Sequence, residues 1–173
     1  KVDDYKKGYY MSLAPLIADG KVLLGASGGE LGVRGFLAAF DAETGKELWK
    51  TYTVPAPGEP GSETWPAGGD HYKRGGASIW VTGTYDPDTN LTFWGTGNGG
   101  PWFGDQRPGD NLYTSSVVAF DATSGAINQV SKTPQARDFQ DYSLGYGTEN
   151  FGRATADTNV AFGASLKGKV SDR

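Results

Sequence analysis

The sequence predicts an all-β protein, and three observations support this. The 27 Gly and 9 Pro residues together make up 36 of 173 positions, and both residue types are poor helix formers. Aromatic residues reach 13%, which is high for a disordered chain. The tetrapeptide 39–42 recurs at 119–122, and each copy ends an apolar run and opens a turn. A repeated unit of strand, Asp-initiated turn and strand is typical of β-propeller blades.

Strands are expected first in the N-terminal third of the chain. Asp19-Gly20 separates two apolar runs, as the turn of a two-residue β-hairpin does. The polar segment 41–46 separates a second pair of runs in the same way. The four strands are expected at residues 9–17, 21–25, 35–40 and 47–54.

The later strands are separated by longer connections. Segment 85–90 has the composition of the earlier Asp-initiated turn, and Gly45 recurs as Gly125. Segments 55–76 and 99–111 are rich in Gly and Pro, and loops of this length in a compact domain are usually functional or disordered. Further strands are expected at residues 77–82, 91–95 and 114–120.

Two regions of different character are expected. Residues 1–127 contain the repeated strands and turns and are expected to form the propeller blades. Residues 128–173 contain no Trp and show no clean hydrophobic period. This tail is either a poorly packed terminus or a divergent segment belonging to the next blade.

Composition excludes several function classes. The net charge is −4 and the longest basic cluster is Lys6-Lys7, so no nucleic-acid partner is expected. The chain has no Cys, and His71 is its only His, which excludes a thiolate or multi-histidine metal site. No apolar run approaches the roughly 18 residues of a membrane span. The chain begins with Lys1 rather than Met, so we expect residue 1 to follow a processing site or an artificial boundary.

Three motifs have both a functional and an ordinary interpretation. Residues 27–30 (Ser-Gly-Gly-Glu) allow close backbone approach to a ligand and offer the Glu30 carboxylate as a hard oxygen donor, or they form a tight turn with a solvated glutamate. Asn98 lies in a Gly-rich segment that no helix pattern follows, which excludes a dinucleotide-binding motif. Its amide oxygen either binds a metal or serves a turn. Trp80 either offers a ring face for stacking or lies in the core.

Six segments together carry a family resemblance. They are residues 27–35, 41–49, 55–66, 82–87, 94–98 and 107–113. In these segments the sequence resembles the pyrroloquinoline quinone (PQQ)-dependent alcohol dehydrogenases, most closely the ethanol-type quinoproteins and more distantly the methanol dehydrogenases. The resemblance spans about residues 5–127 and implies part of an eight-bladed β-propeller. The chain would supply about three blades of antiparallel four-stranded sheet, as a fragment, one part of a larger assembly or a divergent short relative.

The resemblance also implies roles for individual residues. Glu30 and Asn98 match ligands of the active-site calcium or lanthanide, and Trp80 matches the tryptophan whose ring forms the floor under the quinone. The positions that match cofactor contacts are Ser12, Ser27, Gly28, Gly29 and Ser78.

The catalytic aspartate of the family has no collinear match in this sequence. Gln140 stands at the corresponding position. Asp141 follows it and is our candidate for the general base and a third metal ligand, and Asp138 is the rival candidate. Lanthanide-using relatives carry a second aspartate where this chain has Ser143, which favours calcium.

The function implied is oxidation of a primary alcohol to an aldehyde, with electrons passed to a cytochrome c in the periplasm. The missing blades imply association with further propeller blades or with copies of the same chain. Two alternatives stay open: a non-catalytic propeller fragment that binds a partner, and a carbohydrate-binding β domain with exposed Trp side chains.

Overall fold

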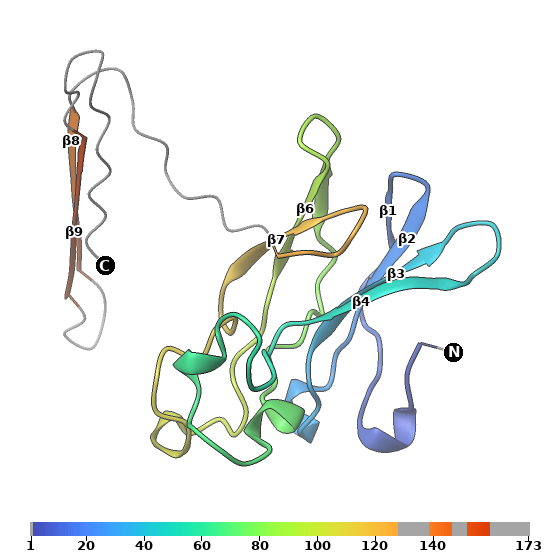
Figure 1. Cartoon of the computed structure of the whole chain (residues 1–173), viewed down its shortest axis with the longest axis horizontal. Coiled ribbons are helices and arrows are strands. Elements are labelled where there is room, and N and C mark those ends of the chain that lie inside the picture. Colours follow the sequence, from blue (N-terminus) through green and yellow to red (C-terminus); the bar gives the residue numbers. More distant parts are fainter. Residues whose placement is uncertain (1, 128–138, 147–151, 160–173) are drawn as a thin grey trace. The chain divides into compact units, whose positions relative to one another are not determined.

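The computed structural model describes residues 2–127, 139–146 and 152–159 (Figure 1). The chain forms two compact units, Lys1–Gln129 and Val130–Arg173. Every strand pairing described is antiparallel, and the helices described are single 3-10 turns of three or four residues. No helix in these ranges is long enough to cross a membrane. The prediction of an all-β chain is therefore confirmed.

The first sheet has four strands in the order β1-β2-β3-β4. The turn between β1 and β2 has φ values of 48° at Asp19 and 70° at Gly20, which confirms the predicted hairpin. The strand expected over 9–17 is mostly wrong, because Pro15 has no N–H to donate to a neighbour and the ladder starts after it. The strands are β1 (Leu16–Ala18), β2 (Lys21–Gly25), β3 (Phe36–Asp41) and β4 (Glu47–Tyr52).

The second sheet has three strands within the described residues, in the order β5-β6-β7. The strand expected over 77–82 is wrong. Ala77 has a left-handed φ of 50°, its N–H donates to the Asn98 carbonyl, and its own carbonyl accepts from the Thr53 hydroxyl. The segment therefore crosses between loops instead of joining a ladder. The strands are β5 (Thr84–Asp86), β6 (Leu91–Gly95) and β7 (Val117–Asp121).

The two sheets repeat the same register at an offset of 80 residues. Phe40 pairs with Glu47 at the start of β4, and Phe120 forms an isolated bridge with Ile127. The repeat seen in the sequence therefore extends to the pairing of backbones. Residues 128–138, which follow Ile127, lie outside the described ranges.

A shared core joins the two sheets. Leu37 from β3, Trp94 from β6 and Phe120 from β7 are fully buried in one cluster with Ile79. Burying an apolar side chain of this size stabilises the fold by about 1.5–3 kcal/mol. The Trp49 ring from β4 also lies against Gly125, and the Thr51 hydroxyl donates to the Gly125 carbonyl at 2.7 Å.

The two ends of this unit differ in structure (Figure 1). One end carries the short turns that join consecutive strands. The opposite end carries the long loops and the five 3-10 helices: η1 (Tyr5–Lys7), η2 (Gly29–Leu31), η3 (Ser62–Thr64), η4 (His71–Arg74) and η5 (Gly104–Gln106).

The second unit contains one described sheet. Strands β8 (Phe139–Tyr146) and β9 (Gly152–Asn159) pair antiparallel, with Asp141 opposite Asp157. The sequence did not locate strands in this tail, because its apolar residues are scattered and show no clean period.

Candidate metal and cofactor site

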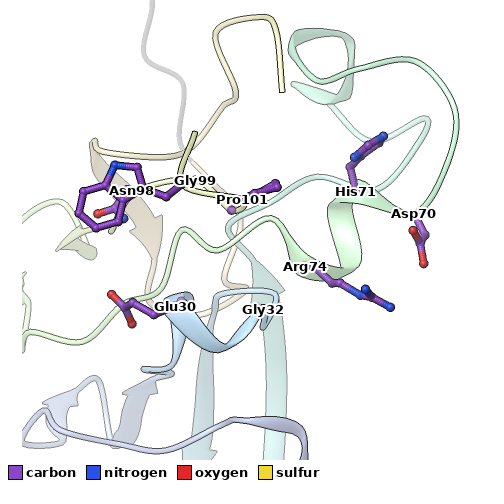
Figure 2. A pocket seen from close by; sticks show the side chains of 11 residues that line it. Glu30, Gly32, Asp70, His71, Arg74, Asn98, Gly99 and Pro101 are labelled. Carbon is purple, nitrogen blue, oxygen red and sulfur yellow. The ribbon is translucent and has the colours of Figure 1, made fainter. Parts of the chain in front are cut away.

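A pocket of about 480 Å³ lies among the loops of the first unit (Figure 2). Three segments far apart in the sequence form its walls: η2 and the residue after it, η4 with the residue before it, and the loop that follows β6. The lining residues are Gly29, Glu30, Gly32, Asp70, His71, Arg74, Asn98, Gly99, Gly100, Pro101 and Trp102.

Glu30 is presented by a single turn of 3-10 helix. Gly28 and Gly32 flank that turn in left-handed conformations, with φ of 106° and 71°, and the Leu31 N–H donates to the Gly28 carbonyl at 2.8 Å. A Cβ at Gly28 would collide with the Gly8 carbonyl, so the backbone here requires glycine. The Glu30 side chain is exposed, and its carboxylate has no hydrogen bond or ion pair among the residues described.

Asn98 enters the same pocket from the facing loop (Figure 2). Its backbone is fixed, because its carbonyl accepts the Ala77 N–H at 2.9 Å. Its side chain is exposed and, like that of Glu30, makes no hydrogen bond to the described part of the chain. Two oxygen donors without a partner among the described residues therefore share one pocket.

Gly76 connects the two loops that carry these donors. Its carbonyl accepts the Gly35 N–H at 2.7 Å, and its own N–H donates to the Val33 carbonyl at 3.0 Å, just after η2. On its other side Gly76 bridges to Gly99, beside Asn98. A Cβ at Gly76 would lie 2.6 Å from the Asn98 carbonyl, so the spacing of the two loops depends on glycine here.

Ser78 lies between two glycines of the site. Cβ atoms built at Gly29 and Gly97 would lie 2.9 and 3.0 Å from its hydroxyl oxygen. Ser78 is only 5% exposed, and its hydroxyl has no hydrogen-bond partner among the described residues. A free hydroxyl in this cradle is suited to a polar atom of a ligand.

Ser12, Ser27 and Trp80 form a second connected group. The hydroxyls of Ser12 and Ser27 lie 2.8 Å apart, and the Ser12 hydroxyl also donates to the Trp80 carbonyl at 3.0 Å. Ser27 is buried, whereas the Trp80 side chain is 55% exposed. Trp80 is therefore no core residue, although it does not line the pocket of Glu30 and Asn98.

The two aspartate candidates lie in the second unit. Asp141 lies on β8, and Ser143 lies two residues further along the same strand. The side chain of Asp141 falls outside what the structure describes, and so does the whole of Asp138. The role of either residue stays a prediction.

The side-chain oxygens of Glu30 and Asn98 are chemically suited to a hard cation. Carboxylate and amide oxygens are the ligands that calcium prefers in proteins. Nowhere in the described ranges do three His, Asp or Glu side chains gather as a complete metal site. A cation held by Glu30 and Asn98 would therefore need further ligands from a cofactor or another part of the protein.

Sequence reasoning missed one wall of the pocket. This wall consists of Asp70 and the η4 residues His71 and Arg74. Like Pro101 and Trp102, they fell inside segments expected only as long loops. His71, the only His of the chain, is exposed and lines the pocket. The Gly pair that follows η4 is the one local sign that this segment approaches other backbone closely.

Comparison with known proteins adds independent information to this geometry. The family model described as "PQQ: Glucose/ethanol/alcohol dehydrogenase, beta-propeller domain" matches residues 1–133. Quinoprotein alcohol dehydrogenase PedH of Pseudomonas putida is 42% identical over 188 aligned positions, which cover 94% of this chain and 31% of PedH.

Two further proteins extend the comparison. Methanol dehydrogenase [cytochrome c] subunit 1 of Methylorubrum extorquens is 38% identical over 81% of this chain and 25% of its own length. A solved structure of a europium-containing methanol dehydrogenase superposes with a TM-score of 0.65 at 35% identity, covering 72% of this chain and 25% of that one. The chain thus spans about a quarter to a third of the length of these proteins.

Proposed function

This chain belongs to the β-propeller domain family of PQQ-dependent glucose, ethanol and alcohol dehydrogenases, and on that premise we propose that it is part of a quinoprotein alcohol dehydrogenase. The reaction proposed is oxidation of a primary alcohol to an aldehyde, with electrons passed to a cytochrome c in the periplasm. In this proposal residues 1–127 are propeller blades with half of the active site, and 128–173 are a divergent tail that continues into the next blade.

One observation carries the proposal. The Glu30 carboxylate and the Asn98 amide line one pocket, and neither has a partner in the described part of the chain. Both side chains are exposed, so their oxygens are hydrated and can exchange water for a cation without giving up a protein partner. The backbones behind both groups are linked through Gly76, so the spacing of the two loops is set before a cation arrives.

Each residue of the site then has a proposed task. Glu30 and Asn98 would hold a calcium ion or a lanthanide, and Asp141 would supply a third oxygen. The exposed ring of Trp80 would bear the flat face of the quinone. When bound, the quinone would supply the hydride acceptor and the cation Lewis-acid activation.

The remaining cofactor contacts divide into free and supporting groups. The Ser78 hydroxyl is free to donate to a polar atom of the cofactor. Ser12 and Ser27 hydrogen-bond to each other, and the Ser12 hydroxyl also donates to the Trp80 carbonyl, so this pair holds the backbone of the tryptophan in place. A Cβ at Gly29 would lie 2.9 Å from the Ser78 hydroxyl, so glycine there leaves this hydroxyl open to the cofactor, whereas Gly28 supplies the left-handed backbone of the turn.

Asp141 is proposed as the general base. One of its carboxylate oxygens would accept the hydroxyl proton of the alcohol as the carbinol hydride leaves. Ser143 stands where lanthanide-using relatives carry a second aspartate, so calcium is the proposed metal.

Association with further propeller blades or with copies of this chain is also proposed. Val117 at the start of β7 is 78% exposed. In the first sheet, β3 at the equivalent position is covered by β4, with Leu37 paired to Thr51. A neighbouring strand or blade would cover the apolar surface of β7 in the same way.

A fluorescence titration tests the proposed function. The purified full chain is titrated with PQQ, with and without calcium, while tryptophan emission is recorded. We expect saturable quenching that depends on calcium, and Glu30→Gln is expected to weaken the calcium-dependent part by about tenfold or more, because changes even behind metal ligands cost about 10–100-fold in affinity.

The matched control is Glu43→Gln, which removes the same charge from an exposed turn at the other end of the unit. The control should titrate like the parent chain. If Glu30→Gln also behaves like the parent, the ligand assignment is wrong. A folded chain that shows no quenching at all would favour the non-catalytic propeller fragment.

A further inference from the structure

We propose that Arg107 is a positioning residue that holds the loop presenting Asn98 to the metal. The proposal rests on the function proposed above, in which Asn98 is a metal ligand. Arg107 does not line the pocket itself. It lies behind the pocket wall formed by residues 98–102 and makes contacts on two sides of its guanidinium group.

The first side of the guanidinium holds the wall of the pocket. Nε of Arg107 donates to the Pro101 carbonyl at 2.8 Å, and Nη2 donates to the Trp102 carbonyl at 3.3 Å. Both acceptors belong to pocket-lining residues. The side chains around them are exposed, so these two bonds are a main restraint on this stretch of backbone.

The second side holds a buried anchor. Nη1 of Arg107 donates to the Asn111 side-chain oxygen. Asn111 is 2% exposed, and both its backbone N–H and its side-chain NH₂ donate to the Thr64 carbonyl, at 3.0 and 3.2 Å. The exposed wall is thereby connected through one guanidinium to the interior of the unit.

Gly99 brings this arrangement next to the proposed ligand. A Cβ at Gly99 would lie 2.6 Å from Cζ of Arg107, so the guanidinium lies against the Cα of the residue that follows Asn98. Gly99 also bridges to Gly76, which fixes its other side. A shift of the guanidinium would therefore be felt one residue from Asn98.

The contacts require arginine and not merely a positive charge. A guanidinium presents five N–H donors in one plane and can serve three acceptors that lie around it. A lysine ammonium at the end of a flexible stem cannot reach Pro101, Trp102 and Asn111 together. Arg107→Lys therefore keeps the charge and removes the geometry.

The test measures binding of terbium alone to the full chain, through luminescence sensitised by tryptophan. Arg107→Lys is expected to bind terbium about 10–100-fold more weakly, the usual cost of changing a residue behind a metal ligand. Amide hydrogen exchange supplies a readout that a general loss of stability would not reproduce. Exchange should rise within 98–106 and stay unchanged in β2 and β6. Lys46→Arg, a conservative swap at the turn end, should change neither readout.

A second pair of variants tests the contact itself. Gly99→Ala should weaken terbium binding as Arg107→Lys does, because the new methyl group displaces the guanidinium. In a chain that already carries Arg107→Ala, Gly99→Ala should cause no further loss of terbium affinity, because the guanidinium that the methyl group would collide with is absent. Additive losses in this cycle would contradict a direct contact.

The outcomes separate this inference from the proposed function. If Asn98→Ala loses terbium while Arg107→Lys retains both affinity and exchange, the positioning role is wrong and the proposed function stands. If the folded parent chain binds no terbium, the proposed metal site is wrong. Amide hydrogen exchange still decides whether Arg107 holds the loop, because in Arg107→Lys it should then rise within 98–106 alone. Exchange that rises throughout the chain would overturn the local role.

Discussion

The turn end and the pocket end of the first unit use the same polar groups in opposite ways. At the turn end, Asp41, Asp86 and Asp121 each open a turn and accept hydrogen bonds from a hydroxyl and a backbone N–H within it. At the pocket end, the side-chain oxygens of Glu30 and Asn98 accept none from the described residues. Partnered carboxylates stabilise the fold, and unpartnered ones are available to a ligand.

The turn end also shows how strictly a local rule can be repeated. The residue four positions after each turn-opening Asp is left-handed: Gly45, Asn90 and Gly125 have φ of 69°, 56° and 71°. Asn90 adopts this conformation at the one turn without glycine, and Asn tolerates it better than most residues. The turns thus share a backbone shape, but their surroundings differ: the Trp49 ring lies against Gly125, whereas nothing lies within 4 Å of a Cβ at Gly45.

That difference allows the largest expected effect. Gly125→Ala introduces a left-handed alanine, at about 1–2 kcal/mol, and drives its Cβ into the Trp49 ring, at about 1–3 kcal/mol of overpacking. Gly45→Ala incurs only the first cost, because nothing lies within 4 Å of its Cβ. In urea unfolding we expect Gly125→Ala to lower the free energy of unfolding by about 3 kcal/mol and Gly45→Ala to lower it by about 1 kcal/mol. Equal losses would show that Trp49 does not hold the two sheets together.

A smaller effect is expected from acid. The pKa of Asp121 is held below its ordinary value, first by the Ser124 hydroxyl and then by the Ser124 N–H. A carboxyl whose pKa is lowered in the folded state adds stability above its unfolded pKa of about 4 and loses it as the pH falls through the lower folded value. Ser124→Ala should therefore lower stability at pH 7, with a deficit that shrinks below about pH 4.

Urea unfolding of the parent chain and of Ser124→Ala, at pH 7 and at a pH below about 4, checks this prediction. The Ser124 side chain is exposed, so the stability lost in Ser124→Ala is expected to be modest and sensitive to salt. A deficit of the same size at both pH values would mean that Ser124 acts through its own packing and not through the charge of Asp121. The equivalent variant at the first turn, Thr44→Val, should show the same pH dependence, since the Thr44 hydroxyl lowers the pKa of Asp41.

The sequence was sufficient where local rules decide the structure. Strands β2 and β6 begin and end as expected, because turn residues bound both sides of their apolar runs. The strand predicted over 77–82 was wrong because the hydrogen-bond partners of this segment come from distant positions. The Thr53 hydroxyl and the Asn98 carbonyl bind Ala77 in a left-handed conformation that no strand adopts. Local pattern carries no information about such partners.

The same distinction applies to the site. Glu30 and Asn98 were expected through the family resemblance, and the structure places both in one pocket. The η4 wall and Arg107 were not expected, because they reach the pocket from long loops that have no hydrophobic period. Asp141 stays a prediction, since its side chain lies outside what is described.

The smallest effect expected on stability belongs to the pocket end. Glu30→Gln and Asn98→Ala should each change the free energy of unfolding by no more than about 0.5 kcal/mol, the usual range for exposed side chains without special contacts. Asp41→Asn at the turn end is the control and should lose stability, because its carboxylate accepts three bonds from Glu43 and Thr44. A clear loss in either pocket variant would mean that the group has a structural partner, and the argument for a ligand site would fail. Stability unchanged while cation binding is lost would identify the two oxygens as groups kept for a ligand.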